Sequence, residues 1–319
     1  MLMSEMLEEN RAYQEGRLDE AERRLSAVVI DGDDSAGLIS VLVSRLAICV
    51  AMGKSDAAYE ALVEVLPLCS HALYGDVDHW TRRVGIIAAV SVETVLMASV
   101  FDIPIIDAGI EDLPVELKAH YGYLLAHRYL RLGQPEQAEG VAFSFLNIIG
   151  SAHPRSEVEL LLTMACATVV TGRVDEASSW FMSAWELSTS TGVVMPFVEL
   201  NYALHGLQRR CLDMRRDERG KRIAALVRRY HKGWFGLRQR CNLYDAGHSL
   251  TPLEMHTLML VARGWRNKEI ALQLRISENT VKHYLSNAYT KIGVSGRAGA
   301  REHMDASIRY AEFRYPRNA

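Results

Sequence analysis

The chain has 319 residues, 49% of them hydrophobic and 24% charged, with a formal net charge of −3. This composition excludes a disordered chain, and at roughly 100–200 residues per domain the length predicts about two domains. No apolar run reaches the roughly 20 residues of a membrane span, and the acidic start lacks the basic and apolar regions of a signal peptide. Five cysteines without a C-x-x-C pair predict neither a disulfide framework nor a cysteine zinc site. We therefore expect a cytoplasmic protein with no membrane partner, metal or cofactor.

The charge is divided between two parts of the chain. Of the 36 basic and 39 acidic residues, 23 and 10 lie in residues 201–319, which gives this part a net charge of +13. The remaining 13 basic and 29 acidic residues give residues 1–200 a net charge of −16. A basic module often binds a polyanion, so the C-terminal part is the candidate for contact with nucleic acid.

A short phrase of glycine, an acidic residue and alanine recurs four times in the acidic part. Its glycines, separated by 37, 80 and 39 residues, are Gly16, Gly53, Gly133 and Gly172. The glycine can end one helix in a left-handed cap, and the acidic residue can cap the next helix or lie in its first turn. The alanine is small enough for two antiparallel helices to approach closely. The phrase therefore predicts a turn between paired helices.

Helix-like apolar segments flank the phrases. They cover residues 38–52, 119–132 and 158–170 before a phrase and 57–68, 138–149 and 177–187 after one. The pattern resembles tetratricopeptide (TPR) repeats, although its spacing exceeds their usual 34 residues and the aromatic positions match poorly. We predict an all-α fold with a TPR-like helical solenoid over 1–207, and a loop at 101–114 where a further phrase would fall.

An alternative for the N-terminal part is a phosphoacceptor receiver domain, because residues 27–34 resemble its first strand and acidic cluster. Such a domain needs alternating strands and helices, and phosphorylation at Asp33, Asp34 or a later aspartate. Asp76 and Asp78 follow no apolar strand.

Residues 208–247 are rich in arginine and predict a basic helical linker. An apolar face is formed by Leu212, Ile223, Leu226 and Tyr230. The arginines could be a solvated surface, make added phosphate contacts, or dock against the acidic half, which would then compete with DNA for the basic linker.

Residues 249–300 predict three helices with short turns. Their predicted caps are Thr251, Asn267 and Ser277, and their predicted ends are Gly264, Leu274 and Ile292. The third helix has an apolar stripe at Val281, Leu285, Ala288 and Ile292. Two short helices joined by a tight turn, the second with a basic polar face, are typical of a helix-turn-helix.

This module resembles the DNA-binding domain of the LuxR/FixJ (GerE-like) family. The matching residues are Leu250-Thr251, Glu254, Gly264, Asn267 to Ala271, Leu274, Ile276-Ser277, Thr280 to Lys282, Leu285, Lys291, Gly293-Val294, Arg297 and Ala300. Two positions depart from the usual pattern: Tyr284 stands where histidine is common, and the variable position is His283. The resemblance implies a four-helix domain over 248–319.

The resemblance also implies a DNA site. The helix over 278–292 would enter the major groove, with Lys282, His283 and Ser286 facing base edges. Phosphate contacts would come from Asn267, Lys268, Thr280 and Lys291. A fourth helix over 297–306 would pair two modules, so we expect a homodimer on an inverted repeat of double-stranded DNA.

We found no constellation of catalytic residues, and expect no enzyme. The predicted function is a bacterial-type transcription regulator whose helical N-terminal domain receives a peptide, protein or small-molecule effector. The alternatives are the receiver-type response regulator and an interaction protein, an anti-activator or scaffold, that titrates a partner regulator.

Overall fold

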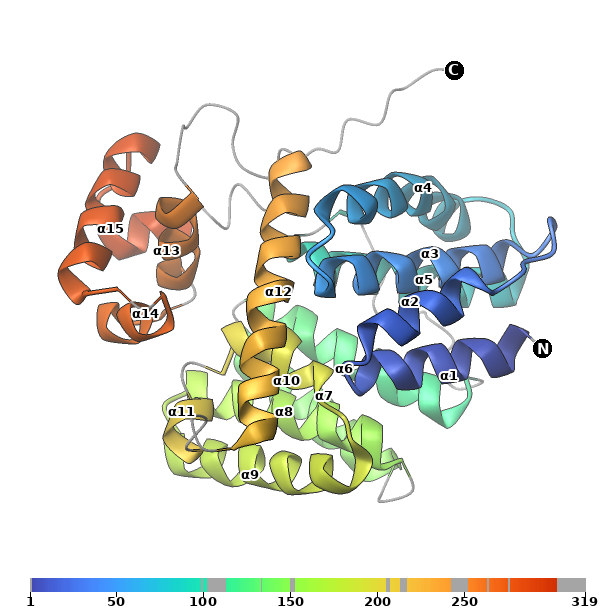
Figure 1. The fold of residues 1–319 in the computed structure, drawn as a ribbon, viewed down its shortest axis with the longest axis horizontal. Coiled ribbons are helices and arrows are strands. Elements are labelled where there is room, and N and C mark those ends of the chain that lie inside the picture. The colour runs from blue at the N-terminus through green and yellow to red at the C-terminus, as the bar shows by residue number, and fades with distance from the viewer. Residues whose placement is uncertain are drawn as a thin grey trace. The chain divides into compact units, whose positions relative to one another are not determined.

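A computed structural model describes most of the chain and shows an all-helical protein (Figure 1). The described residues are 2–98, 100–101, 113–132, 134–149, 153–204, 207–212, 217–241, 252–262, 264–274 and 276–302. They contain no strand, which confirms the predicted fold class. The chain divides into a first unit, up to Met97 and from Phe101 to Leu237, and a second unit, Ala98–Val100 with Arg238 onward. Within these ranges no helix combines the length and apolar character needed to cross a bilayer.

The first unit is built from antiparallel helix pairs. In chain order its helices are α1 (Leu2–Gln14), α2 (Leu18–Ser26), α3 (Ser35–Ala51), α4 (Ser55–Tyr74), α5 (His79–Leu96), α6 (Val115–Arg131), α7 (Pro135–Ile149), α8 (Pro154–Val170), α9 (Val174–Thr191), α10 (Met195–Glu199), a 3₁₀ helix (Leu200–Tyr202), α11 (Leu207–Cys211) and α12 (Glu218–Arg240). The pairs α1–α2, α3–α4, α6–α7 and α8–α9 pack along their lengths. These pairs cover the predicted apolar segments to within one residue. The TPR-like character of the array stays a prediction.

The recurring phrase forms the turns inside these pairs. Gly16, Gly53 and Gly172 have φ of 69°, 76° and 84°, the left-handed backbone that glycine adopts without strain. Gly133 lies outside the described residues. The phrase alanines are all fully buried, with 0% exposure at Ala21, Ala58, Ala138 and Ala177. The acidic residues lie in the first turns of α2, α4, α7 and α9, where the helix dipole favours them.

Helix α5 occupies the gap between the second and third phrases. Asp78 caps it by accepting hydrogen bonds from the N–H groups of Trp80 and Thr81. Glu93, which interrupts an apolar run in the sequence, is buried and pairs with Arg131 of α6 at 3.2 Å. Most of the loop predicted at 101–114 lies outside the described residues.

The receiver alternative is wrong. Residues 27–34 connect α2 to α3 and contain no strand. Asp34, a candidate phosphoacceptor in that alternative, caps α3 by accepting a hydrogen bond from the N–H of Gly37 at 2.8 Å. Asp34 of this acidic cluster is therefore an N-cap, because an aspartate side chain can accept hydrogen bonds from the free backbone N–H groups at the start of a helix.

Polar contacts join α1 to α8, which belongs to the last helix pair, and to α10, which follows that pair. The hydroxyl of Tyr13 donates to Glu199 Oε1 at 2.5 Å, and that of Tyr123 of α6 donates to Oε2 at 3.1 Å. Gln14 Nε2 donates to Glu159 Oε1 at 3.0 Å. These residues, with His120 of α6 beside Glu159, form what we call the polar cluster. The array of pairs is therefore closed by bonds that connect α1 to α8 and α10.

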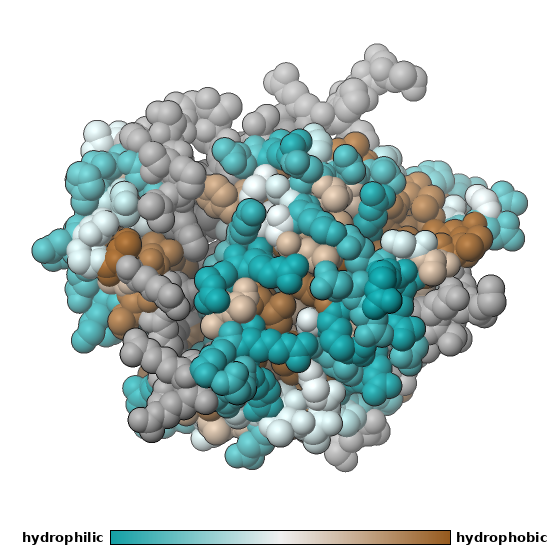
Figure 2. Space-filling model, viewed as in Figure 1, coloured by the Kyte–Doolittle hydropathy of each residue, from teal (hydrophilic) through white to brown (hydrophobic). Residues whose placement is uncertain are grey.

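Helix α12 packs on the turns of the first two pairs. Ile223 and Leu226 are buried, as the predicted apolar face requires. A Cβ at Gly233 would lie 2.2 Å from the carbonyl oxygen of Val50, so only glycine permits this approach. Its exposed basic residues within the first unit are Lys221, Arg222, Arg228, Arg229 and Lys232. Hydrophilic side chains accordingly dominate the centre of the face in Figure 2, where Figure 1 places α12.

Candidate nucleic-acid interface

The second unit contains a helix-turn-helix. Its helices are α13 (Pro252–Ala262), α14 (Asn267–Leu274), α15 (Glu278–Ile292) and a helical segment over 296–302. The described core includes Leu258, Trp265, Ile270, Val281, Leu285, Ala288, Ile292 and Ala300, each at most 6% exposed. The predicted stripe of α15 therefore lies in the core. Because this stripe is buried, the opposite face of α15 is exposed to solvent.

The turn between α14 and α15 is tight and capped. The N–H of Ile276 donates to the carbonyl of Ala271, and the hydroxyl of Ser277 accepts from the N–H of Thr280 at 3.0 Å. Ser277 is thus the N-cap of α15, as predicted. At the other end, Gly293 adopts a φ of 69°. Both ends of α15 are fixed by local bonds.

The start of α14 differs from the prediction by one residue. Asn267 is the first residue of the helix rather than its cap. The reason is a bond from the N–H of Arg266 to Glu269 Oε2 at 2.8 Å, while the carbonyl of Arg266 accepts the first helical bonds. A glutamate three residues into a helix that reaches back to the cap N–H is part of a capping box. Thr251, the predicted cap of α13, lies outside the described residues.

The three candidate base-contacting side chains lie on one exposed face of α15. Lys282, His283 and Ser286 are all exposed and separated by one and three positions. Residues three and four apart share a face of a helix, and the buried stripe occupies the opposite one. His283 Nε2 lies 3.3 Å from Asn287 Nδ2, so a ring nitrogen is within hydrogen-bond distance of the next turn. The face therefore offers donors along one and a half turns.

The four candidate phosphate-contacting residues are placed less uniformly. Lys268 is exposed in the first turn of α14, while Asn267 is partly buried. Thr280 has its hydroxyl 2.8 Å from that of Ser277, so it is already used locally. Lys291 lies in the last turn of α15, but its side chain is outside the described residues. Of these four candidates, Lys268 is the one whose charged side chain is exposed among the described residues.

Two arginines stabilise the domain in a way that the sequence did not indicate. Arg297 donates from Nη1 to the carbonyl of Trp265 at 2.6 Å and from Nη2 to Asn267 Oδ1 at 2.5 Å. Arg301 donates from Nε to the carbonyl of Ala262 at 3.0 Å. Both lie on the segment 296–302 and bind the ends of α13 and the start of α14. The bond from Arg297 uses the amide oxygen of Asn267, and a phosphate contact from its Nδ2 stays a prediction.

Comparisons with known proteins agree with this geometry. Residues 248–304 match the family model described as bacterial regulatory proteins, luxR family. A curated relative, a probable transcriptional regulatory protein SgaR from Hyphomicrobium methylovorum, is 49% identical over 57 residues. The match covers 18% of this chain and 27% of the relative, so the chain spans about a quarter of that relative's length. No solved structure matches. Residues 248–304 therefore form a domain of the luxR family of bacterial regulatory proteins.

Proposed function

We propose that the protein is a sequence-specific DNA-binding transcription regulator. The observation that carries the proposal is the exposed face of α15, with Lys282, His283 and Ser286 opposite a buried apolar stripe. An α-helix fits the major groove of B-DNA, and a recognition helix contacts base edges there through such a face. The proposal is supported by the luxR family match, which covers this helix.

The side chains of α15 suit recognition of guanine. Lysine and a protonated or correctly oriented histidine donate hydrogen bonds to guanine O6 and N7, and serine can contact any base. Lys268, at the start of α14, supplies a charge for a phosphate, and a contact of that kind positions the protein without reading sequence. We also propose that the protein binds as a homodimer on an inverted repeat, with the fourth helix predicted over 297–306 pairing the modules.

The proposed role of the first unit is to receive an effector and control promoter binding. Support comes from its separation as a compact unit with its own core and polar cluster. The exposed basic residues of α12 are consistent with two of the alternatives for the arginine-rich segment, a solvated surface and added phosphate contacts. Competition between the acidic half and DNA stays a hypothesis, and faster proteolysis of residues 242–250 at high salt would support it.

The test is capture of fragmented genomic DNA by the full chain and by variants. Wild-type protein should enrich a common inverted repeat. Lys282→Ala with His283→Ala should lose that enrichment, because each good base contact contributes about 1–3 kcal/mol of discrimination. Lys268→Ala is the matched control: it should weaken binding to all sequences alike and lower the slope of log K against log salt by about one. Equal enrichment by the double variant would contradict the proposed role of α15.

A second arm separates DNA binding from the partner-titrating alternative. If neither the wild-type full chain nor its residues 245–319 enrich any sequence at moderate salt, the regulator proposal falls and that alternative takes its place. Residues 245–319 alone should enrich the same repeat as the full chain. Enrichment by this fragment alone would mean that the first unit blocks DNA binding until its effector arrives.

A further inference from the structure

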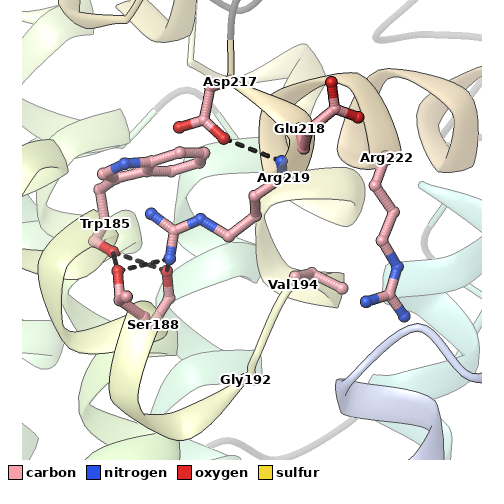
Figure 3. Close-up of a pocket in the computed structure, with 9 residues that line it drawn as sticks. Trp185, Ser188, Gly192, Val194, Asp217, Glu218, Arg219 and Arg222 are labelled. Atoms are coloured by element: carbon pink, nitrogen blue, oxygen red, sulfur yellow. Dashed lines mark hydrogen bonds between the residues drawn. The ribbon is translucent and has the colours of Figure 1, made fainter.

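A pocket of about 700 Å³ lies between α9 and α12 in the first unit (Figure 3). Residues that line it include Trp185, Ser188, Val194, Asp217, Arg219 and Arg222. Its volume is in the range of small-molecule sites, roughly 300–1,000 Å³. Figure 3 shows the two arginines on opposite sides of Val194, with Arg219 extending toward α9 and Arg222 away from it.

The pocket has an apolar floor. Trp185 and Val194 are 7% and 2% exposed, and the guanidinium carbon of Arg219 lies 3.6 Å from the centre of the Trp185 ring. Arg219 Nη1 also donates to the hydroxyls of Ser188 and Thr189, at 2.9 and 2.7 Å. These contacts hold the cation over the ring in one orientation, so it is preorganised for an anion.

The acidic groups of the pocket are already used. Asp217 Oδ1 accepts hydrogen bonds from the N–H groups of Arg219 and Gly220, at 2.8 and 3.2 Å. Glu218 pairs with Lys221 at 2.5 Å. The pocket therefore keeps its carboxylates bound by their own neighbours rather than by the two guanidinium groups.

Both guanidinium groups keep donors for a ligand. Arg222 Nη2 donates to the backbone carbonyl of Glu15 at 2.7 Å, and Arg219 bonds to hydroxyls. Within the described residues, neither arginine forms an ion pair with a carboxylate. Burial lowers the pKa of Arg219, because the charged form has lost part of its hydration. A carboxylate or phosphate can replace the hydration that the guanidinium group has lost, because arginine binds such groups through two parallel N–H bonds.

We propose that this pocket binds a small organic anion. Its carboxylate or phosphate contacts Arg222, its apolar body lies against Val194, and Arg219, held over Trp185 on the other side of Val194, adds a second positive charge to the pocket. The proposal rests on the proposed function, in which the first unit receives an effector, and it names the chemical class of that effector. A ligand that touches both α9 and α12 stabilises their contact by mass action.

Calorimetric titration of the full chain with sodium benzoate and phenyl phosphate tests the proposal. Benzamide is the neutral analogue of benzoate and inorganic phosphate is an anion without an apolar body, and both should bind at least about tenfold more weakly than the organic anions. Arg222→Gln should weaken the binding of benzoate and phenyl phosphate by about tenfold, the factor expected for one charged hydrogen bond. Arg228→Gln removes the same charge from an exposed position of α12 outside the pocket and should leave binding unchanged.

Three results would overturn the proposal: no binding of either organic anion at about 10 mM, equal binding of benzamide and benzoate, or equal binding by wild type and Arg222→Gln. Thermal unfolding without ligand verifies that Arg222→Gln folds as the wild type does. DNA capture is measured separately on the same samples. If the wild-type protein enriches DNA but binds no organic anion, only the proposal about the pocket is rejected. If it binds the anions but enriches no DNA, only the proposed function is rejected.

Discussion

The two units position their polar side chains in different ways. In the second unit, Lys282, His283 and Ser286 come from neighbouring turns of one helix. In the first unit, the polar cluster joins α1, α6, α8 and α10, and the bond between Tyr13 and Glu199 connects positions 186 residues apart. A group of side chains on one helix depends on local structure, whereas a cluster between helices depends on the packing of the whole unit.

Helix α12 offers the most severe test of how far the first unit depends on its packing. Gly233→Ala would bring a Cβ to 2.2 Å from the carbonyl oxygen of Val50, so α12 or the end of α3 must shift. We expect a loss of about 2–3 kcal/mol in the free energy of unfolding of the first unit, the upper part of the usual range of about 1–3 kcal/mol for overpacking, because the Cβ would meet backbone. Chemical denaturation of the full chain measures it.

Gly140→Ala is the matched control for this substitution. Gly140 also lies in a helix, but a Cβ there meets nothing within 4 Å. Alanine should therefore stabilise α7 by about 0.5–1 kcal/mol through helix propensity alone. If both substitutions change the free energy of unfolding in the same direction, the close approach of α12 is not what stabilises the unit.

The next effect is a pH dependence confined to the first unit. Burial raises the pKa of Glu199 to about 7, and that of Glu9 to about 7 as well. Burial lowers the pKa of His120, but the hydrogen bond and charge of Glu159 outweigh this and raise it. Each of these groups binds a proton more tightly in the folded state than in the unfolded state. The free energy of unfolding therefore falls as the pH rises from the group's pKa in the unfolded state through its pKa in the folded state. Glu199 should contribute about 1–2 kcal/mol to the loss.

Thermal unfolding at about pH 5.5 and about pH 8.5 measures this effect. The melting temperature of the first unit should fall by several degrees over that range, at about 2–4 °C per kcal/mol. Glu199→Gln should reduce the fall, because its side chain stays neutral. Glu64→Gln, which removes an exposed charge from α4, should not. A rise of the melting temperature with pH would contradict the prediction.

The smallest expected effect lies in the second unit. Ser277→Ala removes the hydroxyl that caps α15 and should cost about 1 kcal/mol of stability in the fragment 245–319. Ser286→Ala, nine residues further along the same helix and exposed, should leave stability within about 0.5 kcal/mol while changing DNA preference. Urea unfolding of the two variants compares them. A larger loss from Ser286 would show that this face packs rather than stays open.

Local patterns made much of the fold predictable. The phrase of glycine, acidic residue and alanine predicted turns at Gly16, Gly53 and Gly172, because positive φ and close helix packing are requirements of single positions. The periodic stripe of α15 and the cap at Ser277 were predictable for the same reason. The predicted cap at Asn267 was wrong by one position, since the deciding bond comes from Glu269.

Contacts between distant segments were not predictable. Arg297 matches the family pattern, but nothing in the sequence indicates that its guanidinium binds Trp265 and Asn267. Arg219 is one arginine among many in its segment, and only the packing of α12 on α9 brings it over Trp185. The polar cluster has no motif, because its members come from four helices and their burial depends on the closed array.

The closed array also has a consequence for synthesis of the protein on the ribosome. Tyr13 is translated 186 residues before its partner Glu199. At about 5–20 residues per second, about 10–40 s pass before α10 exists, and until then α1 has its partner α2 but not its later partners. The face of α1 that binds α8 and α10 is therefore among the last surfaces of the unit to be covered, and during that time it is available to chaperones.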